Sequence, residues 1–179
     1  MNGNTALQVS RHAIPAPGTV IAGDVVIGID PGVSGAIAIL PRVRPPEPKV
    51  YDMPVIGIGK GFVKRAVDLP ALTAILRPYG IVGDAVAYVE RVSAFPGQGV
   101  ASMFSLGMSY WGAAGVLAGL QIRTVFVEPK QWKSRFALNR DKMKSLEVAR
   151  RYFPGIELGR KKDHNRAEAL LIAQYGGEQ

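Results

Sequence analysis

Three acidic residues, Asp30, Glu90 and Glu168, fall at positions where a carboxylate has chemical use. Asp30 ends the apolar run 25–30 and Glu90 ends the apolar run 85–90. An acid at the end of a buried strand is costly unless it is exposed, paired or bound to a metal. Gathered together, the three carboxylates fit two divalent cations, which activate a water and stabilise a leaving 3′ oxygen in phosphodiester hydrolysis. Without a cation they repel one another, and that cost argues for function.

A fourth ligand is expected near the start of the segment 163–173. His164 precedes Glu168 by four residues, so the two side chains share one face of a predicted helix. Asp163, five positions before Glu168, would point about 140° away from it and is better explained as the helix cap. His164 is therefore the favoured fourth metal ligand, and Asp163 the less favoured one.

Each residue also has an ordinary structural explanation. Asp30 precedes a Pro-Gly pair and could cap a turn. Glu90 could pair with the adjacent Arg91, and His164 could make a surface contact with Glu168. The metal-site interpretation depends on the whole set.

Composition limits the partners. The chain has 179 residues, of which 47% are hydrophobic, and this suits one compact domain. Against 14 acidic residues stand 22 lysines and arginines, giving a formal charge of +8, so the surface should attract a polyanion such as nucleic acid. A soluble protein that is merely basic is the alternative. The absence of cysteine excludes disulfides, thiolate zinc sites and thiol catalysis, and it is compatible with a reducing cytoplasm.

Two regions bear on localisation. The segment 99–120 is interrupted by glycines and serines, so no membrane span of about 18 residues, and no membrane partner, is predicted. Residues 1–23 lack the apolar core of a secretory signal and are predicted to form a flexible tail before a single domain at 24–179. The expected location is the cytoplasm of a bacterium or a phage-infected host. The alternative is a transit peptide and an organelle such as the chloroplast, because the segment before Asp24 contains Ser and Arg and has no acid.

The pattern of apolar runs predicts a mixed α/β fold. Strands are expected at 25–30, 35–40, 49–53, 85–90 and 123–127; helices are expected after Asp68, over 100–120, from Pro129, from Asp141 to about Phe153, and from near Asp163 to Tyr175. The order βββαβαβα is that of the RNase H-like fold. It implies a five-stranded mixed sheet, a three-strand antiparallel meander plus parallel strands, with helices on both faces. The first and fourth strands lie side by side, which would bring Asp30 to Glu90.

Three motifs resemble those of RuvC-type Holliday junction resolvases: Ile27-Gly-Ile-Asp-Pro-Gly-Val-Ser-Gly35, Tyr88-Val-Glu90 and His164-x-x-Ala-Glu-Ala-Leu-Leu-Ile-Ala173. The likeness spans about 25–176 and is nearest to the phage and bacterial RuvC-like branch and to the chloroplast branch of plants.

The resemblance implies an endodeoxyribonuclease that cuts four-way DNA junctions by paired symmetrical nicks, leaving 5′-phosphate and 3′-hydroxyl ends. It implies two Mg²⁺ or Mn²⁺ ions per site, no small-molecule cofactor and a homodimer. Asp30, Glu90, Glu168 and a residue at the start of the final helix would hold the metals. Because imidazole suits Mn²⁺ better than Mg²⁺, His164 predicts activity with Mn²⁺ at least equal to that with Mg²⁺. His164 could instead be a base for the attacking water.

The resemblance also suggests DNA-binding parts. The loop after Glu90 would reach the junction centre, with Arg91, Phe95 as a stacking wedge, and Gln98; Phe104 is a second candidate wedge but more typical of core or interface. Basic residues near helix starts are candidate phosphate ligands: Lys130, Lys133, Lys142, Lys144, Lys161 and Lys162. The glycine-rich helix 100–120 could form the dimer interface or pack tightly on the protein's own sheet.

Other functions stay open at this stage. An RNase H-like nuclease could act on RNA–DNA hybrids, flaps or forks. A non-catalytic DNA-binding protein could keep the fold. The run Asp30-Pro-Gly-Val-Ser-Gly35 also resembles the phosphate-binding hairpin of actin-like nucleotide-binding domains, although those need two such domains.

Overall fold

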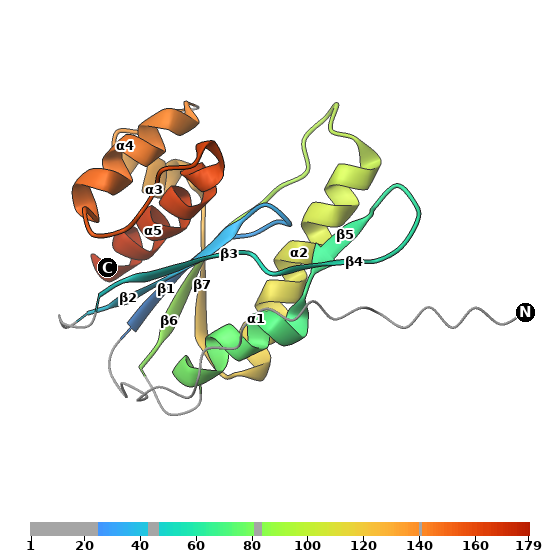
Figure 1. Cartoon of the computed structure of the whole chain (residues 1–179), viewed down its shortest axis with the longest axis horizontal. Coiled ribbons are helices and arrows are strands. Elements are labelled where there is room, and N and C mark those ends of the chain that lie inside the picture. Colours follow the sequence, from blue (N-terminus) through green and yellow to red (C-terminus); the bar gives the residue numbers. More distant parts are fainter. Residues whose placement is uncertain (1–24, 43–46, 81–83, 140) are drawn as a thin grey trace, which may run out of the picture.

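The computed structural model describes residues 25–42, 47–80, 84–139 and 141–179. For Lys161 it describes the backbone but not the side chain. Its centre is a five-stranded sheet in the order β3-β2-β1-β6-β7 (Figure 1). The strands are β1 Val25–Asp30, β2 Ala36–Pro41, β3 Lys49–Asp52, β6 Val86–Glu90 and β7 Arg123–Val127. β1, β2 and β3 form an antiparallel meander, and β6 and β7 continue the sheet in parallel with β1. The predicted RNase H-like arrangement is confirmed.

Helices cover both faces of this sheet. One face carries α3 Pro129–Arg135, α4 Lys142–Tyr152 and α5 His164–Gly177. The other carries α1 Leu69–Leu76 and α2 Val100–Gly119. Alternate residues of the central strands enter the two cores, so that Val26 packs with α5 whereas Ile27 and Ile29 pack with the α1–α2 side. Burial on both faces explains the continuous apolar runs of these strands.

The helix starts follow the sequence signals. Asp68 accepts a hydrogen bond from the Ala71 amide, and Asp141 accepts one from the Met143 amide, so both are N-caps as predicted. Two short 3₁₀ turns, η1 Arg77–Tyr79 and η2 Lys161–Asp163, precede β6 and α5 respectively. The final helix extends through Gly177 rather than stopping at Tyr175, because Gly176 fits closely against the Tyr88 ring and is held in the packed helix.

A second, two-stranded sheet was not predicted. β4 Val55–Gly57 and β5 Arg65–Val67 pair antiparallel and form a hairpin on the α2 side of the molecule. These strands are only three residues long, and the segment is rich in glycine and lysine, so it lacks the apolar alternation by which longer strands are found. Residues 1–24, which include the predicted tail, lie outside the described part of the chain.

The sequence predicted no membrane-spanning segment, but helix α2 is long and apolar enough to be a candidate span. Its 20 residues have the length and apolar composition of a membrane-crossing helix, because the interspersed glycines and serines lower its hydropathy less than expected. One such helix is weak evidence for a span. In this fold Tyr110, Ala113 and Leu117 are buried in the core below the helix.

Candidate active site

The ends of β1 and β6 bring two of the three acids together. Ile29 pairs with Val89 in the parallel ladder, so Asp30 and Glu90 follow at the same edge of the sheet. The Glu90 carboxylate accepts a 3.0 Å hydrogen bond from Trp132 Nε1 of α3, and only 13% of its side chain is exposed. The sequence-predicted alternative, an ion pair of Glu90 with Arg91, is wrong: Arg91 turns away and pairs with Glu128 at 3.2 Å.

Helix α5 supplies the third acid. It approaches β1 closely at Gly28, where an added Cβ would lie 2.1 Å from the Ala169 carbonyl oxygen. Only glycine permits this distance. The contact fixes the buried Glu168, whose Oε1 lies 3.4 Å from Ser145 Oγ of α4. The position of Glu168 over the sheet therefore depends on a residue just before Asp30.

Lys133 of α3 lies between two of the carboxylates. Its Nζ is 3.6 Å from Glu168 Oε1 and 3.9 Å from Glu90 Oε1. Lys133 was expected to bind DNA, whereas in this structure its ammonium partly neutralises the acids. The same side chain lies over the fully buried Trp132, with Nζ 5.0 Å from the ring centroid.

The charges of the three acids act on one another. Burial, followed by the charges of Glu90 and Glu168, raises the pKa of Asp30 well above its usual value. Burial also raises the pKa of Glu90, with Lys133 opposing and Glu168 adding to the rise. The ionised Glu90 and Glu168 thus make Asp30 harder to ionise.

His164 lies at the start of α5 and contacts Lys142. Lys142 Nζ is 3.2 Å from His164 Nε2. Because an ammonium only donates, Nε2 is the acceptor in this contact, which places the imidazole proton on Nδ1. Lys142 also lowers the pKa of Asp30 and of Glu90, so its charge reaches the acidic group from the side of His164.

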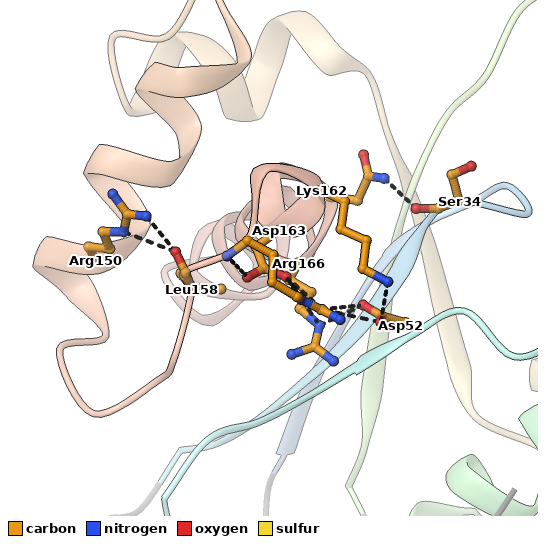
Figure 2. Close-up of polar contacts among 9 residues, drawn as sticks. Ser34, Asp52, Arg150, Leu158, Lys162, Asp163 and Arg166 are labelled. Carbon is orange, nitrogen blue, oxygen red and sulfur yellow. Dashed lines mark hydrogen bonds and ion pairs between the residues drawn. The ribbon is translucent and has the colours of Figure 1, made fainter.

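Asp163 has a structural role different from the predicted one. It occupies the N-cap position of α5, but its side chain caps no α5 amide. Its carboxylate turns back instead and accepts bonds of 2.7 Å from the Arg160 amide and from Arg160 Nε (Figure 2). Although burial raises the pKa of Asp163, the bonds and charge of Arg160 hold it below its usual value. Asp163 is thus engaged with Arg160.

The same arginine joins α5 to the edge of the sheet. Arg160 contacts both carboxylate oxygens of Asp52 at 3.1 and 3.2 Å, and Arg166 Nε lies 2.6 Å from Asp52 Oδ1 (Figure 2). The Nζ of the exposed Lys162 also lies 3.8 Å from the Asp52 carboxylate. Although burial raises the pKa of Asp52, Arg166 and Arg160 hold it below its usual value. We call Asp52, Arg160, Asp163 and Arg166 the α5 clamp.

The donor set fits a hard divalent cation. Within residues 25–42, 47–80, 84–139 and 141–179, no three acidic or histidine side chains are gathered tightly enough to form a ready-made metal site. The acids nevertheless raise one another's cost of ionisation, and carboxylate oxygens are the ligands that Mg²⁺ and Mn²⁺ prefer. A cation held by Asp30, Glu90 and Glu168 would relieve that cost.

The loop after Glu90 is open to solvent. Phe95 is 67% exposed, and the side chain of Arg91 is 52% exposed although it pairs with Glu128. Gln98 borders two clefts, one beside Asp30 and one beside Trp111, and its buried Oε1 has no hydrogen-bond donor among the described residues. The remaining predicted lysines are distributed as follows: Lys130, Lys142, Lys144 and Lys162 are exposed, and the side chain of Lys161 lies outside the described part of the structure.

Two contact residues of the site were missed from the sequence. Trp132 and Ser145 hydrogen-bond to Glu90 and Glu168, respectively. Each lies on a helix remote in sequence from its carboxylate, and a tryptophan or serine in a helix carries no signal of such a partner. Only the packing of α3 and α4 on the sheet reveals them.

No family model matches this chain. A chloroplastic Holliday junction resolvase of Chlamydomonas reinhardtii is 36% identical over 117 residues, which is 62% of this chain and 13% of that protein. The chain therefore spans about an eighth of the length of this relative. Thermus thermophilus RuvC in complex with a Holliday junction substrate has a TM-score of 0.54 and 15% identity, covering 84% of this chain and 90% of RuvC. A second Thermus thermophilus RuvC structure has a TM-score of 0.51, with 18% identity and coverage of 84% and 92%.

The strand order and the flanking helices are those of the RNase H-like fold, and the two Thermus thermophilus RuvC structures share this fold. The sequence similarity to the algal resolvase agrees with the resemblance of the three motifs to those of RuvC-type resolvases.

Proposed function

We propose that this protein is a metal-dependent endodeoxyribonuclease that resolves four-way DNA junctions by paired nicks, leaving 5′-phosphate and 3′-hydroxyl ends. The observation that carries the proposal is the convergence of Asp30, Glu90 and Glu168 at one edge of a RuvC-type sheet. The names of the similar proteins support the substrate, because the algal relative is a Holliday junction resolvase and one RuvC structure contains a junction. The proposed nuclease domain is 24–179.

The residues have distinct roles in this proposal. Asp30, Glu90 and Glu168 would hold two Mg²⁺ or Mn²⁺ ions, and His164 would be the fourth ligand. Bound cations supply activation of the attacking water and stabilisation of the leaving 3′ oxygen. Trp132 and Ser145 orient their two carboxylates, and Lys133 holds the site together electrostatically until cations bind. In the metal-bound site the Lys133 ammonium would be available to a backbone phosphate.

The exposed face of α2 suits the proposed homodimer. Four large apolar side chains, Val100, Phe104, Met108 and Trp111, recur at helical spacing and are 37–79% exposed. Gly112 packs against Leu69 of α1, whereas nothing lies near Gly107, Gly115 or Gly119 in the described structure. The small residues thus leave room for a second helix at three of four positions. Two sites related by a twofold axis would cut symmetrically placed strands.

The test compares substrates. A labelled mobile four-way junction, a flap, a replication fork, a linear duplex and an RNA–DNA hybrid are each incubated with the protein and Mg²⁺ or Mn²⁺. Symmetrical nicks confined to the junction are expected, and Asp30→Asn should abolish cutting while sparing junction binding. Preferred cleavage of the hybrid, flap or fork would replace junction resolution by another nuclease activity. Binding with no cleavage would favour a non-catalytic DNA-binding protein, and ATP binding alone would favour the actin-like alternative.

Cytoplasmic localisation stays a prediction. The algal relative is chloroplastic, which supports the organelle alternative.

A further inference from the structure

A basic hairpin lies beside the acidic site. In the segment 53–67, which contains β4 and β5, Lys60, Lys64 and Arg65 are exposed and no acidic residue occurs. Phe62, near the turn, is 98% exposed. Neither the fold nor the proposed chemistry accounts for an almost fully exposed aromatic ring with three cations within three residues of it in the sequence.

The hairpin also forms one wall of a cleft that leads to Asp30. This open cleft has a volume of about 500 Å³ and is bordered by Asp30 and the loop 31–35. Residues 62–65 of the hairpin line it, and the start of α2 with Gln98 lines it as well. In Figure 1 the hairpin lies beside α2, and β5 contacts that helix. A strand whose phosphate reached Asp30 would thus continue between the hairpin and α2.

We propose that the β4–β5 hairpin is a DNA-binding arm for the strand being cut, with Phe62 stacking on a base next to the scissile phosphate and Lys64 and Arg65 contacting flanking phosphates. The inference rests on the proposed nuclease function and adds a binding surface to it. Aromatic stacking tolerates any base, and paired cations follow the backbone, so the arm grips a distorted strand irrespective of its sequence.

Charge distinguishes DNA from a second copy of this chain as the occupant. The chain carries a formal charge of +8, and all charged residues of the hairpin segment 53–67 are cations. A second copy of this positively charged chain would therefore be repelled by the hairpin. The apolar stripe of α2, in contrast, carries no charge at its four exposed large residues. The arm is also separate from the loop 91–99: Phe95 does not line the Asp30 cleft, whereas Phe62 does.

The test measures junction binding in an Asp30→Asn background, where cutting does not interfere. Phe62→Ala should weaken binding roughly 5- to 150-fold, the range for loss of one stacked base, and Phe62→Trp should restore it. Lys64→Gln with Arg65→Gln should reduce the slope of log affinity against log salt by about 1 to 2. Arg77→Gln, an exposed cation at the end of α1, is the matched control and should leave the slope unchanged. 2-Aminopurine placed beside the cleavage site should be quenched by the parent protein and not by Phe62→Ala.

The outcomes separate the arm from the nuclease function. If the wild-type protein resolves junctions while the Phe62 and Lys64/Arg65 variants bind with unchanged affinity and salt slope, the arm is refuted and the nuclease function stands. If the wild-type protein neither binds nor cuts junctions, both fail. If the variants change sedimentation from dimer to monomer with unchanged intrinsic DNA affinity, the hairpin belongs to a protein interface and the inference is wrong. Because Phe62 is almost fully exposed, its replacement should leave the thermal unfolding temperature unchanged, which verifies that the variant is folded.

Discussion

Replacement of Lys133 by methionine tests whether the three carboxylates form one electrostatic unit. Methionine keeps an aliphatic chain over Trp132 and removes the charge. At 3.6 and 3.9 Å, each attraction to Glu168 and Glu90 is about 4 kcal/mol at an effective dielectric of 20. Lys133 is 30% exposed, so screening and its own desolvation leave a net loss of about 2–4 kcal/mol on removing it. For a chain of this size each kcal/mol lowers the Tm by about 2–4 °C.

The assay is urea unfolding with EDTA and with saturating Mn²⁺, at pH 5 and pH 8. Removing the ammonium raises the pKa of Glu90 still further above its unfolded value, so the ionised form is penalised more in the folded state. The loss should therefore be larger at pH 8 than at pH 5, and Mn²⁺ should reverse most of it. Lys144→Met, an exposed charge change on α4, is the control and should have little effect. An equal loss at both pH values, with and without Mn²⁺, would refute the electrostatic explanation and assign the effect to packing on Trp132.

Three further predictions concern single residues. Asp30→Asn should raise the Tm in EDTA at pH 7.5, because the raised pKa of Asp30 means that its ionised form destabilises the fold. This gain in Tm should disappear below the unfolded pKa of about 3.9, where the carboxyl is protonated in both states. A lower Tm of the variant at pH 7.5 would contradict this explanation. Asp52→Asn should cost about 0.5–1.5 kcal/mol at pH 7, because the lowered pKa of Asp52 stabilises the fold above about pH 4. This contribution is lost as the pH falls through the folded pKa, so the difference from wild type in urea unfolding should shrink steadily as the pH is lowered below about 4, and a constant difference would contradict the ion-pair explanation. The wild-type protein should be at least as active with Mn²⁺ as with Mg²⁺, and His164→Asp should lower the ratio of the two rates several-fold; an equal loss with both metals would exclude His164 as a ligand.

The sequence predicted the main sheet well because its strands are buried on both faces and end in acids. Asp30 and Glu90 could be brought together from the strand order alone, since parallel neighbours end at the same edge. The helix starts at Asp68 and Asp141 followed from the capping preference of aspartate. Local signals of this kind need no knowledge of distant contacts.

The features that were not predicted depend on contacts between residues far apart in the sequence. Lys133 is one of several basic residues near helix starts, and nothing local distinguishes an ammonium that lies between two carboxylates from one that faces DNA. Asp163 has the signature of a helix cap, but Arg160 offers its carboxylate a stronger, charged partner. The hairpin of β4 and β5 was not predicted, because it packs against α2 through β5 and its strands show little hydrophobic pattern of their own.

The origin of the acids along the chain has a consequence for the growing polypeptide. Asp30 and Glu90 leave the ribosome before Glu168, which belongs to α5, the helix that docks on Gly28 and is held by the α5 clamp. A nascent chain can pair β1 with β6 and still lack one wall of the acidic site. The proposed nuclease would therefore stay inactive toward nearby DNA until α5 has been synthesised and has docked on the sheet.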